Sequence, residues 1–215
     1  MKKQLTEIVF ILDRSGSMAG LESDTIGGFN SMIERQKRED GEVLVSAVLF
    51  SDISEVLYDR VPLDRIRAMT DRDYTVGGCT ALLDAVGSAV RHIGNVHKYA
   101  REEDRPEKTL FVITTDGMEN ASHRYTYDKV KQMIERQQSR YGWEFIFLGA
   151  NIDAAREAGR FGIARERAVD YHADQQGTET IYAAVSEACC EIRRHKPLSA
   201  NWRKAVDKDF EERRK

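Results

Sequence analysis

Residues 8–17 read Ile8-Val-Phe-Ile-Leu-Asp-Arg-Ser-Gly-Ser17 and join an apolar run to a short polar loop. An apolar run of this length, rich in β-branched residues, indicates a strand that is buried on both faces. The loop places one carboxylate, Asp13, ahead of two hydroxyls, Ser15 and Ser17, at two-residue intervals. Hard oxygen ligands of this kind suit Mg²⁺, Mn²⁺ or Ca²⁺ and not zinc. The stretch therefore predicts a metal-binding loop at the carboxyl end of a buried strand.

Strand-like and helix-like runs alternate along the rest of the chain. Strands are expected at residues 7–12, 43–50, 54–58, 109–114, 145–148 and 168–171. Helices are expected at residues 21–37, 80–96, 127–140, 152–159 and 177–194, with a short helix around 63–69. This alternation predicts a three-layer, doubly wound α/β fold with a mostly parallel sheet and helices on both faces. The turn at Ser51-Asp52 is too short for a parallel crossover, so the strand after it should be an antiparallel edge strand.

Two more polar segments stand where such a sheet would bind a ligand. Gly77-Gly78-Cys79-Thr80 precedes an expected helix, and Thr114-Thr115-Asp116-Gly117 follows a second buried-strand run at 109–113. Ligand sites in doubly wound sheets lie beyond the carboxyl ends of the strands, where the chain direction switches. The strands that precede Asp13 and Asp116 are expected to be central neighbours, so these two carboxylates should meet at one edge of the sheet.

Together the three segments resemble the metal-ion-dependent adhesion site (MIDAS) of the von Willebrand factor A (vWA) domain family. The likeness covers roughly Leu5 to Arg194 and is closest to the small stand-alone, cytoplasmic members found in bacteria. It implies a central sheet with a divalent ion at its top, Mg²⁺ in the first place and Mn²⁺ or Ca²⁺ as alternatives. The metal-site residues that the resemblance assigns are Asp13, Ser15, Ser17, Thr80 and Asp116.

The resemblance also implies what such an ion would do. Family members complete the coordination of the metal with waters and with a carboxylate from a partner protein. Neutral hydroxyl ligands and at most two carboxylates leave positive charge on the ion, which favours an anionic sixth ligand. The expected function is therefore a binding module, or adaptor, that recognises an Asp or Glu of another protein and has no chemistry of its own.

Each site residue also has a simpler interpretation when it is taken alone. Ser15, Ser17 and Thr80 could be loop or helix-cap hydroxyls, and Asp13 and Asp116 could be turn residues. Their joint order and spacing favour the metal site.

Four further residues near these segments carry weaker expectations. Cys79 is expected to be a small buried filler, and Arg14 is expected to point to solvent beside the site. Glu119 lies either on the rim or in a solvated loop. No role can be assigned to Asp52 from the sequence.

Two other functions fit the sequence less well than a binding module. A Mg²⁺-dependent phosphatase could use Asp13, but such hydrolases usually place a second carboxylate two residues later, where this chain has Ser15. A serine hydroxyl cannot act as a general acid near neutral pH. A receiver-like phosphoacceptor domain would need an acidic pair after the first strand, and no suitable pair precedes Asp13.

Composition limits the class of protein. The chain has 215 residues, of which 41% are hydrophobic and 32% charged, and its formal net charge is −3. Such a chain can bury a core without disulfides, and it shows no basic excess that would favour nucleic acid. The apolar runs are too short to cross a membrane, and the N-terminus leaves no room for a signal peptide. We therefore expect a cytoplasmic protein with neither nucleic-acid nor membrane partners.

The sequence divides into two parts of unequal length. A vWA domain is expected over residues 1–195, followed by a charged C-terminal segment over residues 196–215. This segment carries an apolar residue at every fourth position, which would form one stripe on a short helix: Trp202, Val206 and Phe210. The stripe is expected to pack back on the domain, with a partner contact as the alternative.

Overall fold

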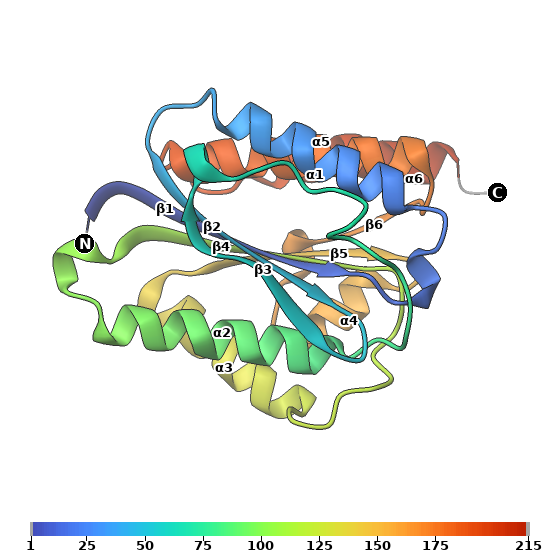
Figure 1. Cartoon of the computed structure of the whole chain (residues 1–215), viewed down its shortest axis with the longest axis horizontal. Helices are drawn as coiled ribbons and strands as arrows, with labels where there is room; N and C mark the ends of the chain where they lie inside the picture. The colour runs from blue at the N-terminus through green and yellow to red at the C-terminus, as the bar shows by residue number, and fades with distance from the viewer. Residues whose placement is uncertain (1, 214–215) are drawn as a thin grey trace.

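A six-stranded sheet runs through the centre of the molecule in the order β3-β2-β1-β4-β5-β6 (Figure 1). The computed structural model describes residues 2–213 of the chain, with side chains from Leu5 onward. The strands are β1 (Lys2–Asp13), β2 (Glu42–Phe50), β3 (Ser54–Pro62), β4 (Pro106–Thr115), β5 (Glu144–Ala150) and β6 (Ala168–Tyr171). Neighbouring strands pair in parallel except β2 and β3, which are antiparallel at one edge. The predicted α/β fold with one antiparallel edge strand is confirmed.

Helices cover both faces of this sheet (Figure 1). One face carries α1 (Glu22–Gln36), α5 (Gln175–Arg193) and α6 (Lys204–Glu212), and the other carries α2 (Leu82–Tyr99), α3 (Tyr127–Tyr141) and α4 (Ala154–Arg160). Short 3-10 turns complete the chain: η1 (Gly16–Met18), η2 (Leu63–Arg65), η3 (Glu102–Asp104), η4 (Arg165–Arg167) and η5 (Ala200–Arg203). Within residues 2–213, no helix combines the length and apolar character that crossing a bilayer requires.

The apolar run in β1 explains why the sheet is covered on both sides. Alternate side chains of a strand point to opposite faces. Phe10 packs in the cluster under α1 and α5, where its ring meets the edge of Phe29 with centroids 5.3 Å apart. Val9 and Ile11 pack in the second cluster, under α2 and α3. Because both faces of β1 are apolar, the strand takes a central position and carries its terminal loop to the middle of the sheet edge.

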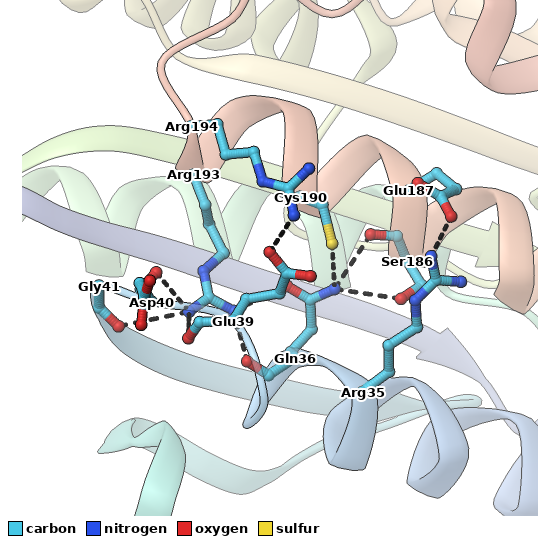
Figure 2. A network of polar contacts seen from close by, with 10 residues as sticks. All are labelled: Arg35, Gln36, Glu39, Asp40, Gly41, Ser186, Glu187, Cys190, Arg193 and Arg194. Atoms are coloured by element: carbon cyan, nitrogen blue, oxygen red, sulfur yellow. Dashed lines mark hydrogen bonds and ion pairs between the residues drawn. The ribbon is translucent and has the colours of Figure 1, made fainter.

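Polar contacts join the C-terminal ends of α1 and α5 (Figure 2). The guanidinium of Arg193, which is 8% exposed, donates to the backbone oxygen of Gln36 at 2.6 Å and to its side-chain oxygen at 2.9 Å. It also donates, over 2.8 to 3.3 Å, to the backbone oxygens of the next turn, Glu39, Asp40 and Gly41. The carbonyls at a helix C-terminus lack partners within the helix and carry partial negative charge. Arg193 therefore caps α1 and fastens it to α5.

The segment after α5 returns to the sheet. Trp202 and Val206 are 4% and 1% exposed, and the indole Nε1 of Trp202 donates to the backbone oxygen of Glu166 at 3.2 Å. Phe210 stacks on His172, with ring centroids 4.7 Å apart. The apolar stripe of this segment thus lies along β6 and the start of α5.

Several element boundaries depart from the sequence expectations; β1, for example, begins at Lys2 and not at Glu7. The helix expected to start at residue 80 begins at Leu82, so Thr80 is not its N-cap residue. The short helix expected around 63–69 is only the 3-10 turn η2, because a single turn there is followed by extended chain. β3 continues to Pro62, four residues beyond the expected end, because its later residues still pair with β2.

Candidate metal centre

The carboxylate of Asp13 is fixed at the end of β1, where it is 1% exposed. Its Oδ1 accepts a hydrogen bond from the backbone N–H of Ser15 at 2.7 Å. Its Oδ2 accepts from Thr115 Oγ1 at 2.7 Å and from the backbone N–H of Asp116 at 3.4 Å. The adjacent strand β4 therefore orients the Asp13 side chain, and both of its oxygens are engaged within the protein.

Three hydroxyls gather beside this carboxylate. Ser15 Oγ and Ser17 Oγ lie 3.2 Å apart across the turn η1. A Cβ placed on Gly117 would lie 3.4 Å from both Ser17 Oγ and Thr80 Oγ1, so these two hydroxyls face the same small space. The hydroxyls of Ser15, Ser17 and Thr80 thus converge from two loops that are distant in the sequence.

Thr80 owes its position to the loop after β4. Its backbone N–H donates to Oδ1 of Asn120 at 2.9 Å, and the backbone N–H of Asn120 donates to the Thr80 carbonyl at 3.1 Å. On its other side, Gly78 accepts from the N–H of Gly16 at 3.0 Å and has a φ of +81°. A side chain at Gly78 would collide with Asp52, because a Cβ there would lie 2.4 Å from Oδ1 of Asp52. The glycine is therefore required by both the backbone angle and the close approach.

Asp116 is the second buried carboxylate, 4% exposed. Its Oδ1 accepts from Nδ2 of Asn151 at 2.8 Å. Burial raises the pKa of Asp116, the Asn151 hydrogen bond opposes this rise, and the nearby charge of Asp13 adds to it. Within residues 2–213, no Lys, Arg or His side chain contacts either carboxylate. Two buried carboxylates without a counter-charge are costly unless a cation joins them.

Sequence reasoning missed several residues that build this site. Tyr74, which is 1% exposed, donates its hydroxyl hydrogen to the backbone oxygen of Asp13. Tyr74 lies in a long irregular connection, so no periodicity could have marked it. Thr115 is the last residue of β4 and Asn151 follows β5, and a position at the carboxyl end of a strand was a usable signal. Asn151 has a φ of +55°, a conformation that Asn adopts more readily than most residues.

The expectation for Arg14 is wrong. Its side chain is only 11% exposed and forms an ion pair with Glu55 of β3 at 3.0 Å, so it does not point to solvent. The expectation for Cys79 is also wrong, because the residue is exposed. Asp52, to which no role was assigned, accepts a hydrogen bond from the backbone N–H of Cys79. It thereby stabilises the loop that contains Gly77 and Gly78.

Glu119, and not Thr80, caps the N-terminus of α2. Its Oε2 accepts from the backbone N–H of Leu83 at 2.8 Å, in the first turn of α2. Its Oε1 accepts from the backbone N–H groups of Ala121 and Ser122 at 2.9 and 2.7 Å. A loop carboxylate therefore caps α2, which leaves the Thr80 hydroxyl free to face Gly117.

The five predicted residues, Asp13, Ser15, Ser17, Thr80 and Asp116, meet at the carboxyl edge of the sheet. No group of three or more His, Cys, Asp or Glu side chains in residues 2–213 is placed to hold a metal ion. The predicted set has only two such side chains, and its other oxygens come from hydroxyls. A cleft of about 450 Å³ opens beside the site and is lined by Ser17, Leu21, Asp24, Asp116, Asn151 and Asp174.

Solved structures share this architecture. A von Willebrand factor type A structure from Catenulispora acidiphila matches with a TM-score of 0.55 and 13% identity, over 86% of this chain and 42% of that one. The fold is that of a vWA domain. At this identity the likeness shows the fold alone. No family model and no curated protein matches the chain by sequence.

Two further vWA-like structures were solved with metals. Proximal thread matrix protein 1 from the mussel byssus, with a zinc-occupied MIDAS motif, has a TM-score of 0.57 and 16% identity over 86% of this chain and 46% of that chain. The manganese-loaded TRAP protein of Plasmodium vivax has a TM-score of 0.56 and 16% identity over 83% of this chain and 72% of that chain. The present chain thus spans about half the length of the mussel protein.

Proposed function

We propose that this vWA domain is a metal-dependent protein-binding module. Asp116 and the hydroxyls of Ser15, Ser17 and Thr80 would hold a divalent cation, with Asp13 supporting the site. A bound cation would offer an open coordination position to an Asp or Glu carboxylate of a partner protein. The observation that carries the proposal is the pair of buried carboxylates, 1% and 4% exposed, that lie beside three hydroxyls and have no cationic partner in residues 2–213.

The chemistry of the donors supports Mg²⁺ in the first place. All five side chains offer oxygen, which suits Mg²⁺, Mn²⁺ and Ca²⁺. Three of the five are neutral hydroxyls and Asp13 only supports the site, so Asp116 alone would place a negative charge directly on the ion and positive charge would remain. An acidic residue of a partner protein is therefore the ligand that this site favours. The zinc and manganese in the two solved neighbours support a divalent ion at this position of the fold.

We further propose that the site binds and does not catalyse. A phosphatase of the kind considered above would need Asp13 as a free nucleophile. Here the N–H of Ser15 and the hydroxyl of Thr115 occupy its two oxygens, each at 2.7 Å. The residue two positions later is Ser15, which supplies no general acid. A stand-alone bacterial, cytoplasmic adaptor stays a prediction of the sequence.

Calorimetric titration of metal-free protein with Mg²⁺, Mn²⁺ and Ca²⁺ tests the proposal. Saturable binding is expected for the wild type and for Ser54→Ala, which removes an exposed hydroxyl at the start of β3. Binding should be lost in the Ser15→Ala/Ser17→Ala double variant, whose circular dichroism should stay native. Equal binding by the wild type and the double variant, or none by the wild type, would refute the metal site.

A further inference from the structure

Exposed apolar side chains are found at two ends of the molecule. The large exposed hydrophobic residues in the part of the chain that the structure describes are Ile53, Val56, Tyr99, Met118 and Tyr141. Tyr99 and Tyr141 are the last residues of α2 and α3, at the end of the sheet away from the metal centre. Ile53 and Met118, each 69% exposed, lie on loops beside the metal centre. Exposed apolar side chains beside a binding site are available to contact a partner protein.

The sheet order places these two residues on opposite sides of the metal loop. Strands β2 and β4 are the two neighbours of β1, whose end carries Asp13. Ile53 follows β2, and Met118 follows β4. Neighbouring strands lie about 4.8 Å apart, so the ends of β2 and β4, from which these loops start, are about 10 Å apart with the end of β1 between them.

Backbone hydrogen bonds hold these loops in place. The N–H of Arg14 donates to the carbonyl of Phe50 at 2.8 Å, and the N–H of Ala81 donates to the carbonyl of Ser51 at 2.9 Å. On the other side, Asn120 is bound to Thr80 through both its backbone and its side chain. Arg14, the cation within the metal loop, is already paired with Glu55. The cation of the metal loop is therefore engaged, and Ile53 and Met118 offer exposed apolar contacts on either side of it.

We propose that Ile53 and Met118 form an apolar rim that selects the partner segment. The preferred segment is extended and carries an aliphatic residue two positions before and two positions after the metal-binding Asp or Glu. In an extended chain these three side chains share one face, and the outer two lie about 13 Å apart. That spacing lets the outer residues reach both loops while the acid reaches the centre. This inference rests on the proposed metal-dependent binding.

Fluorescence polarisation with two labelled heptapeptides in Mg²⁺ tests the rim. The first peptide is Gly-Leu-Ser-Asp-Ser-Leu-Gly, and the second replaces both leucines by serine. We expect the leucine peptide to bind the wild type about tenfold more tightly, since each leucine would be partly buried. The preference should vanish in Ile53→Ser/Met118→Ser, while the calorimetric affinity for Mg²⁺ stays unchanged. Tyr99→Ser, which removes an exposed apolar residue at the far end, should keep the preference.

The outcomes separate the rim from the metal-binding function. Equal Mg²⁺-dependent binding of both peptides would overturn the rim and leave the proposed function standing. A preference that persists in the Ile53→Ser/Met118→Ser variant would overturn it as well. If the protein binds Mg²⁺ but neither peptide, both the rim and the recognition of a partner carboxylate are refuted.

Discussion

Asn151 and Asp116, which stand 35 positions apart, are joined by a hydrogen bond of 2.8 Å between Nδ2 and Oδ1. The bond links the ends of the neighbouring strands β4 and β5 at the candidate metal centre. It also explains why Asn151 adopts a φ of +55°, because the turned backbone aims its amide at the carboxylate. Asn151 thereby fixes the direction of the Asp116 carboxylate.

Replacing Asn151 by Gly should weaken divalent-metal binding about tenfold, because outer partners of metal ligands contribute to affinity on that scale. Glycine adopts the positive φ without strain, so thermal stability should change little. Asn151→Ala loses the same donor and also strains the backbone, so it should bind metal as weakly and melt at a lower temperature. Calorimetric titration beside thermal circular dichroism checks both effects. Unchanged affinity in Asn151→Gly would show that Asp116 does not depend on this contact.

Arg193→Met should lower the free energy of unfolding by about 3 kcal/mol, since a buried set of charge-assisted hydrogen bonds to the end of α1 is lost. The next residue provides a control, because Arg194 lies on the surface and pairs with Glu39. Exposed ion pairs contribute little, so Arg194→Met should leave the unfolding curve nearly unchanged. Urea denaturation followed by tryptophan fluorescence measures both variants. Equal effects of the two would contradict the capping role of Arg193.

Gly27 and Gly28 in α1 should respond oppositely to alanine. A Cβ at Gly28 would lie 2.3 Å from Cδ2 of Tyr182, whereas a Cβ at Gly27 meets nothing within 4 Å. Gly27→Ala should stabilise the protein by about 0.5–1 kcal/mol through helix propensity. Gly28→Ala should destabilise it by about 2 kcal/mol, because α1 and α5 must move apart. Urea denaturation of the pair provides the test, and stabilisation by Gly28→Ala would contradict the close packing of these helices.

Arg213→Ala should lower the melting temperature near neutral pH and have little effect in acid. The Arg213 guanidinium beside Asp174, with an N–O distance of 2.5 Å, holds the pKa of that carboxyl below its usual value. A depressed pKa stabilises the fold above the unfolded-state pKa, and this contribution is lost as pH falls through the folded-state pKa. The difference in melting temperature between the variant and the wild type should therefore shrink below about pH 4.

Thermal melts across a pH series measure this effect. Lys208→Ala serves as the control, because it removes one positive charge from α6, which directly precedes Arg213, and Lys208 pairs with the exposed Glu212 at 3.8 Å. Arg213 also pairs with Asp209 at 2.6 Å. A melting-temperature difference that is equally large in acid and at neutral pH would show that Arg213 does not act through Asp174.

Much of the fold could be predicted from the sequence, because apolar residues recur every few positions on the buried face of each strand and helix. The run at 8–12 indicates a central strand whichever elements cover it, and the tight turn at Ser51-Asp52 excludes a parallel crossover. The neighbour relation of β1 and β4 also follows from the alternation of strands and helices, and the register confirms it. Helix ends follow less directly from the local sequence: the N-terminus of α2 is capped by Glu119, which lies 36 positions after Leu83.

The order of the elements and the residue types that meet at the sheet edge follow from the sequence alone, because hydrophobic burial is non-directional and produces a local periodicity of apolar residues. The pairing of the polar groups depends on the tertiary structure. Thr115 donates to Asp13 across 102 positions, and buried Glu7 finds Arg60 and His97 across 53 and 90 positions. Hydrogen bonds need distances near 3 Å and defined angles, so their partners depend on how the packed elements are placed.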